Sequence, residues 1–191
     1  MNVVYYLIAS TVLIVSFEHL HSDKASEKMI FTTAKINSSA ELFHQKHPFF
    51  TKVYFSKSDA EMILGEKAHL SDSSSTVKKD TLEIKKAYNA NSKDKKTGKT
   101  GTVYFMIEEY NQVTSAKKAY NTIKVANEKH AGVKKLHDVG DEAYFHSDGN
   151  NFCFVLVRKQ KTLFRMKVNK ITSTTSLDEF NRIAKKISEN L

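Results

Sequence analysis

The sequence predicts an α+β fold, in which an antiparallel sheet of four to five strands carries helices packed on one face. Alternating side chains at Thr102–Tyr110 and Leu163–Val168 are typical of strands. Apolar residues at helical spacing in 114–129 and 176–190 are typical of amphipathic helices. Strand, strand and helix follow one another twice along the chain. This order predicts two β-β-α units that share one sheet.

An uncharged apolar run, Val3–Phe17, lies near the start of the chain. As a helix it would extend about 22 Å, short of the roughly 30 Å hydrocarbon core of a bilayer. This length is typical of a signal peptide, although no Lys or Arg precedes the run and no clear small-residue cleavage site follows it. Three interpretations stay open: a cleaved signal, an uncleaved anchor, or a buried helix. We interpret residues 1–28 as a signal peptide or membrane anchor plus spacer, which places the rest of the chain outside the cytoplasm.

Residues 29–55 are interpreted as an N-terminal extension and 56–191 as a single α+β domain. A short helix is predicted over 37–45. His44 and His47 are three residues apart, which on a helix would bring them onto one face. Two histidines without a third ligand do not make a metal site, so the sequence predicts no bound metal and no cofactor.

The domain opens with a predicted helix, Lys57–Leu64, with a capping-box pattern at Ser58 and a stop at Gly65. Ser71–Thr76 is rich in serine and is predicted to be a loop. Thr81–Tyr88 is predicted to be a strand, because Leu82 and Ile84 share one face.

The helix predicted over 114–129 has an apolar stripe that includes Ala116, Tyr120 and Ile123. Gly132 ends it, and Val133–His137 is predicted to be a short strand. The last helix begins with a capping box, in which Ser176 is followed by Glu179. Its buried stripe comprises Leu177, Phe180, Ile183, Ala184 and Ile187.

The clearest local pattern is the stretch 138–145 with the hairpin that follows it. Gly140 is predicted to form a turn with positive φ, and Asp141 and Glu142 to cap that turn or lie in water. Phe152–Val157 is apolar on both faces, as expected of an interior strand. Arg158–Lys161 is predicted to be a polar turn that leads into the half-buried strand Leu163–Val168.

A resemblance to other proteins rests on three features: the run from Val139 through Gly140 to Tyr144, the strand that ends at Lys159, and the terminal helix. It resembles a loose group of small exported bacterial envelope proteins of uncharacterised function, over roughly the last two thirds of the chain. Many of those relatives are lipoproteins, whereas here no cysteine follows the apolar run. The resemblance implies export and an α+β fold, and it implies no catalytic residue.

The chain is basic: 30 Lys and Arg stand against 21 Asp and Glu among 191 residues, a formal charge of +9. Nucleic-acid sites favour arginine forks and clustered basic stripes. Here the lysines are spread widely and arginine is scarce, so we interpret the charge mainly as a solvated surface. The single cysteine, Cys153, lies in an apolar strand pattern and is predicted to be a small buried side chain.

Three groups of residues are candidates for chemistry or binding. Acids and histidines near Gly140 offer acid–base groups, namely His137, Asp138, Asp141, Glu142 and His146. Four tyrosines could line a pocket or belong to the core, namely Tyr104, Tyr110, Tyr120 and Tyr144. A basic patch on the hairpin is the sharpest binding hypothesis, comprising Arg158, Lys159, Arg165 and Lys167, with Lys161 beside them.

These observations favour a non-enzymatic envelope protein, exported or held at the membrane through residues 3–17, that binds a partner or an anionic ligand. Two alternatives stay open. A hydrolase would use the acid and histidine cluster around Gly140. A cytoplasmic nucleic-acid-binding domain would require the first apolar run to be structural.

Overall fold

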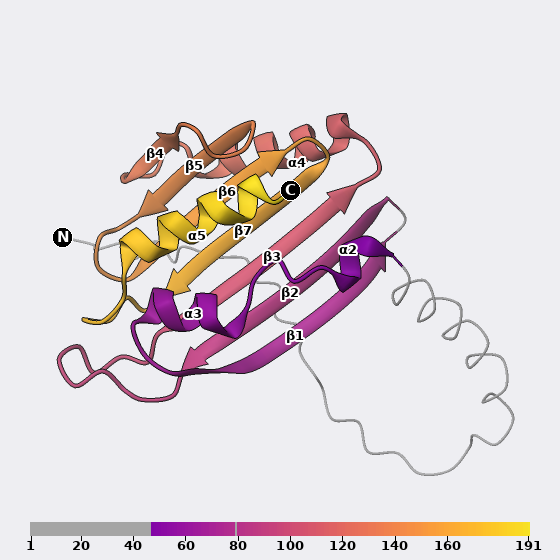
Figure 1. Ribbon diagram of the computed structural model, residues 1–191. Coiled ribbons are helices and arrows are strands. Elements are labelled where there is room, and N and C mark those ends of the chain that lie inside the picture. The colour runs from indigo at the N-terminus through magenta and orange to yellow at the C-terminus, as the bar shows by residue number, and fades with distance from the viewer. Residues whose placement is uncertain (1–46, 79) are drawn as a thin grey trace, which may run out of the picture. The chain divides into compact units, whose positions relative to one another are not determined.

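The computed structural model of the protein describes residues 47–78 and 80–191. The helices in this part are α2 (Pro48–Thr51), α3 (Lys57–Leu64), α4 (Val113–Asn127) and α5 (Leu177–Glu189). The strands are β1 (Ala68–Lys78), β2 (Thr81–Ala90), β3 (Thr102–Tyr110), β4 (Val133–Leu136), β5 (Glu142–Ser147), β6 (Phe152–Lys159) and β7 (Thr162–Asn169). The α+β class is therefore confirmed, and Figure 1 shows the arrangement.

The strands in the described residues form one antiparallel sheet of seven, in the order β1-β2-β3-β7-β6-β5-β4. The predicted four to five strands were too few. The prediction that Ser71–Thr76 is a loop was wrong, because this stretch lies inside β1 and pairs with β2. Its residues are polar on both faces and almost all exposed, so no hydrophobic alternation marks it as a strand.

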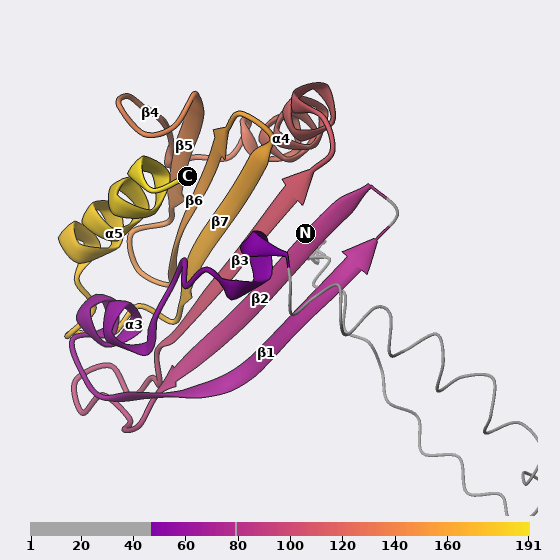
Figure 2. The ribbon, with the colours of Figure 1, turned by 45° about the vertical axis from the view of Figure 1, so that its right-hand side comes forward.

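The prediction that the helices lie on one face was also wrong, because they cover both faces of the sheet. One core cluster joins α3 and α5 to side chains such as Phe105 and Phe164. A second, smaller cluster joins Tyr120 of α4 to Leu156 and Leu163, which point to the opposite side. Figures 1 and 2 show α3 and α5 on one side of the sheet and α4 on the other.

The sequence explains this arrangement through β6. Phe152, Phe154 and Leu156 alternate with Cys153, Val155 and Val157, so both faces of the strand are apolar. Each face needs a cover, since exposed apolar surface costs roughly 25 cal/mol per Å². Helix α5 supplies one cover and α4 the other.

The helix ends follow local sequence signals. Ser56 caps α3, and Asp59 completes the capping box. The sequence had suggested Ser58 as the capping residue, so the cap lies two residues earlier than predicted. Gly65 ends α3 in the left-handed conformation, as predicted. Ser176 caps α5 by accepting the backbone N–H of Glu179, which confirms the predicted helix start. The carboxylate of Glu179, which the predicted capping box would turn back to Ser176, accepts from Arg182.

Residues 47–55 contribute to the same core as the predicted domain. Phe49 of α2 and Phe55 are buried, and Phe55 stacks on Phe105 of β3 with ring centroids 5.1 Å apart. The side chain of His47 caps α2 by accepting the Phe49 N–H. The predicted helix over 37–45 and the residue His44 lie outside the described residues.

Candidate functional site

The candidate site lies on the α4 side of the sheet, where α4 covers only part of the surface. The helix packs over Tyr144, Leu156 and Leu163. Beyond this cluster the same face continues over the neighbouring strands as what we call the open face, and Phe154 packs against the cluster at the boundary. The open face comprises Lys85, Ala87, Tyr104, Met106, Phe154, Arg165 and Lys167, with Asp72 at its rim.

Strand register brings these residues together. Tyr104 of β3 lies opposite Lys167 of β7, and Met106 lies opposite Arg165. On the other side of β7, Phe154 of β6 is the partner of Lys167. Because directly opposite residues in a sheet point to the same face, aromatic and cationic side chains alternate across the open face.

The open face holds a shallow depression of about 240 Å³. Tyr104 is 45% exposed there, although large aromatic side chains usually bury most of their surface. Residues from β1, β2, β3, β6 and β7 line the depression: Asp72, Lys85, Lys86, Ala87, Tyr104, Phe105, Met106, Phe154, Arg165, Met166 and Lys167. Three cationic side chains, Lys85, Arg165 and Lys167, lie on this face against the one carboxylate of Asp72, so the depression favours an anion. The Lys86 side chain points to the other face, where its Nζ donates to the Phe55 carbonyl.

The cations differ in how far they are already paired. Arg165 Nη2 donates to Glu108 Oε2 at 2.8 Å, and Lys85 Nζ lies 2.9 Å from Glu83 Oε1. Lys167 forms no ion pair with any described residue, and its Nζ lies 5.5 Å from the centroid of the Phe152 ring. Lys167 is therefore the cation with most capacity left for an incoming anion.

Two buried polar atoms beside the depression lack hydrogen-bond partners among the described residues: the hydroxyl of Tyr144 and Nε of Arg165. Tyr144 and Arg165 lie in one row across the sheet, with Leu156 between them. Burial, with Tyr120 nearby, raises the pKa of Tyr144 to about 12 against the opposing effect of Arg165. Unsatisfied buried donors are uncommon in folded proteins, so this row stands out from the rest of the sheet.

The predicted basic patch is only partly assembled. Arg165 and Lys167 lie at the depression, on the same face as Arg158. Lys159 points to the opposite face, where its Nζ donates to the Ser188 carbonyl at 2.8 Å. Lys161 pairs with Glu109, with the charged atoms 2.6 Å apart.

Arg158 is a buried structural residue, and the sequence assigned it wrongly to a polar turn. The turn proper is Gln160–Lys161, between the ends of β6 and β7. Arg158 Nε donates to Glu142 Oε2 at 2.6 Å, and its Nη1 donates to Asp141 Oδ2 at 2.8 Å. The same Asp141 oxygen accepts the Gln160 N–H at 2.7 Å. We call these contacts the Arg158 clasp.

Gly140 allows the clasp to close. Its φ is 63°, and an added Cβ would lie 2.6 Å from the Arg158 carbonyl oxygen. The predicted turn with positive φ is thus confirmed, and the acids that follow it have a structural partner. The run Val139–Tyr144, on which the family resemblance rests, therefore supplies the residues through which the Arg158 clasp joins β5 to β6.

Among the acids and histidines considered for hydrolysis, His146 lies apart from Glu142. Glu142 and His146 stand at opposite ends of β5, about 13 Å apart at the usual rise per residue. His146 is buried between His130, whose ring stacks at 5.8 Å, and Phe152, whose ring meets it edge-on at 4.9 Å. In the described part of the chain, no group of three or more His, Cys, Asp or Glu side chains is placed to hold a metal ion.

The tyrosines divide in the same way. Tyr120 and Tyr144 pack edge-to-face under α4, with ring centroids 6.2 Å apart, and belong to the smaller core. Tyr110 packs against that core, whereas Tyr104 lines the depression. Sequence reasoning missed Lys85, Met106 and Phe154 as site residues. Strand alternation placed Met106 on the face of Tyr104, but only the β3–β7 pairing brings Lys167 beside it.

No protein-family model, curated protein or solved structure matches the chain. Among the helices of residues 47–191 that the structure describes, none combines the length and apolar character of a bilayer span. The apolar run 3–17 lies outside those residues.

Proposed function

We propose that this protein is a non-enzymatic binding protein of the cell envelope, exported or membrane-anchored, that holds an anionic ligand with an apolar body. The observation that carries the proposal is the depression on the open face. Its apolar floor of Tyr104, Met106 and Phe154 lies beside Arg165 and Lys167. A ligand that covers about 100 Å² of this floor gains about 2.5 kcal/mol.

Charge adds selectivity to that apolar contact. An anion about 4 Å from a surface cation gains on the order of 1 to 4 kcal/mol, depending on the local dielectric. Lys167 can supply this attraction without giving up a carboxylate partner among the described residues. We therefore expect the depression to prefer an aromatic anion over a neutral molecule of the same shape.

A fluorescence titration with two probes tests this preference. 1-Anilinonaphthalene-8-sulfonate is an aromatic sulfonate, and N-phenyl-1-naphthylamine is its neutral counterpart. The Lys167→Gln variant should weaken binding of the sulfonate by about tenfold, the effect of losing about 1.4 kcal/mol, and leave binding of the amine within about twofold. Lys185→Gln is the matched control, because Lys185 is exposed on α5, on the other side of the sheet.

The Tyr104→Ser variant should weaken binding of both probes, since it removes part of the floor. Equal sulfonate affinity in the wild type and Lys167→Gln would refute the site, as would equal losses in Lys167→Gln and Lys185→Gln. Circular dichroism of each variant establishes that the fold is retained.

The proposed location rests on the apolar run Val3–Phe17. The mature chain should begin near residue 18 to 28, or the full chain should fractionate with membranes. N-terminal sequencing and fractionation of the native protein test this. Recovery of the chain in the cytosol with Met1 retained would overturn the envelope assignment and leave the ligand site to be judged separately.

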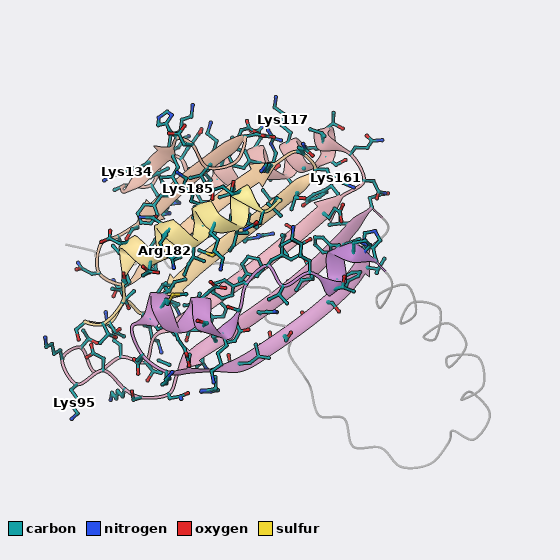
Figure 3. The ribbon with its side chains drawn as sticks, viewed as in Figure 1. Lys95, Lys117, Lys134, Lys161, Arg182 and Lys185 are labelled. Carbon is teal, nitrogen blue, oxygen red and sulfur yellow. The ribbon has the colours of Figure 1, made fainter. Side chains whose placement is uncertain are left out.

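No specific observation favours the two alternative functions. Two acids of the proposed hydrolase site, Asp141 and Glu142, are engaged by Arg158, and His146 is far from Glu142 along β5. The basic residues labelled in Figure 3 come from separate parts of the fold and do not themselves form one basic stripe, the arrangement that favours nucleic-acid binding: Lys95, Lys117, Lys134, Lys161, Arg182 and Lys185.

A further inference from the structure

Strand β1 forms one edge of the sheet, and no described strand pairs with its outer side. It is the longest strand in the described part of the chain, at 11 residues, and nearly all of its side chains are exposed. An edge strand presents a row of unpaired N–H and C=O groups that can pair with another chain. Figures 1 and 2 show β1 along the border of the sheet, away from α4 and α5.

Among the described residues, the opposite edge of the sheet is short and charged, whereas β1 is long and regular over most of its length. Strand β4 has only 4 residues, two of them the adjacent lysines Lys134 and Lys135, and short charged edges discourage pairing. Strand β1 contains no proline, and its only irregularity is a shift in register between Leu70 and Asp72. From Asp72 to Lys78 the register with β2 is unbroken.

The regular segment of β1 is complementary to itself. Its midpoint is Ser75. When two copies of the segment run antiparallel about a two-fold axis at Ser75, Asp72 of each copy lies opposite Lys78 of the other. Opposite charges that face each other directly stabilise a strand pair, and like charges destabilise it.

The charged groups at both ends are available for such a contact. Asp72 is exposed and forms no ion pair with the described residues. Lys78 is exposed and lies 3.2 Å from Glu83, which also has Lys85 as a partner at 2.9 Å. Lys78 can therefore bond a second carboxylate without leaving Glu83 unpaired.

We propose that β1 pairs antiparallel with β1 of a second copy of this chain, in the register that sets Ser75 on the two-fold axis. The two sheets then form one continuous sheet, and their open faces lie on the same side. The contact area of one strand pair is small, so the dimer is weak and exchanges rapidly. Apart from Asp72, which also lies at the rim of the open face, the inference uses no residue of the proposed ligand site.

Charge-reversal variants test both the interface and its register. Sedimentation velocity of the full chain, from about 1 µM to about 1 mM, measures the dissociation constant of the dimer. The Asp72→Lys variant places lysine opposite lysine at both ends and should weaken self-association by about tenfold or more. Lys78→Asp places aspartate opposite aspartate and should do the same.

Mixing the two variants restores attraction at both ends, because each Lys then faces an Asp. The mixture should therefore form a heterodimer at wild-type strength, as should the Asp72→Lys/Lys78→Asp double variant with itself. A wild-type chain that stays monomeric throughout the range overturns the proposal. A dimer whose dissociation constant is unchanged in both single variants also overturns it, because the contact would then lie on another surface.

A cross-link provides a second measurement that does not depend on charge. Opposed Cα atoms in an antiparallel pair lie about 4.5 to 5.5 Å apart, within the range that a disulfide bridges. Ser75→Cys should therefore form an intermolecular disulfide under mild oxidation, and Ser73→Cys, two residues from the axis, should form it at least about tenfold more slowly. Equal rates at the two positions would refute the register. The native Cys153 is buried and does not compete.

Discussion

Replacing Arg158 with glutamine should cost the fold about 3 kcal/mol. The guanidinium donates to Glu142 at 2.6 Å, to Asp141 at 2.8 Å and to the Gln160 carbonyl at 3.0 Å. Hydrogen bonds to charged groups contribute roughly 1.5 to 3 kcal/mol each. Glutamine keeps part of the apolar stem and one amide donor pair, but it cannot span both carboxylates.

The carboxylates moderate this loss because they can return to water. The side chains of Asp141 and Glu142 are 43% and 30% exposed, whereas that of Arg158 is only 8% exposed. The loss in the free energy of unfolding caused by Arg158→Gln should therefore lie near the lower end of the cost of breaking a buried ion pair, which is roughly 3 to 5 kcal/mol. For a chain of this size, a loss of about 3 kcal/mol lowers Tm by about 6 to 12 °C.

Urea unfolding followed by circular dichroism measures the change in the free energy of unfolding. The matched control is Arg182→Gln, which removes an exposed pair with Glu179, three residues away on α5. That pair should contribute little, because both groups are exposed and solvent screens their attraction. If Arg158→Gln costs no more than Arg182→Gln, the clasp is not a stabilising feature and the account of the Gly140 motif fails.

Three further predictions concern single residues. Gly140→Ala should destabilise the fold by more than about 2 kcal/mol, because its backbone is left-handed and the added Cβ would clash with the Arg158 carbonyl. The control Gly149→Ala also has a positive φ but no atom within 4 Å of the added Cβ, so it should cost only about 1 kcal/mol in the same urea assay. Equal losses in the two variants would contradict this prediction. Burial raises the pKa of Cys153 to about 12, so a thiol reagent at pH 8 should label it only in denaturant, and rapid labelling of the native protein would disprove its burial. Burial, assisted by His130, lowers the pKa of His146 below its ordinary 6.5, so the unfolded state binds more protons and the free energy of unfolding should fall as pH drops from about 7 to about 5.5. His146→Gln should flatten that slope in urea titrations at each pH, and an unchanged slope would exclude His146 as its source.

The segments predicted correctly are those whose sequence shows a period. Thr102–Tyr110 alternates and forms β3 with the predicted ends, and Lys57–Leu64 forms α3 between Ser56 and Gly65. Strand β1 could not be found this way, because Ser71–Thr76 is polar on both faces and is held by pairing with β2. This stretch is a strand because it pairs with β2, and no pattern in its own sequence predicts that pairing.

Part of the site could have been inferred from alternation alone. Arg158 and Lys159 are neighbours in β6, so they must point to opposite faces and cannot belong to one patch. The depression itself required the register of β3 with β7, across a sequence separation that no local pattern encodes. The same holds for the clasp, since the β5–β6 register alone makes Arg158 the partner of Glu142.

The positions of α4 and α5 decide whether the two β-β-α units are copies of each other. The predicted order is present, as β2-β3-α4 and β6-β7-α5, and the two hairpins meet where β3 pairs antiparallel with β7. A two-fold axis that exchanges these antiparallel neighbours must stand perpendicular to the sheet, and it would leave both helices on the same face. They lie on opposite faces, so the units repeat an order of elements without a symmetric arrangement. Among the described helices, α4 is therefore the one on its side of the sheet. It covers Leu156 and Leu163 but not Tyr104 or Met106, which belong to the open face.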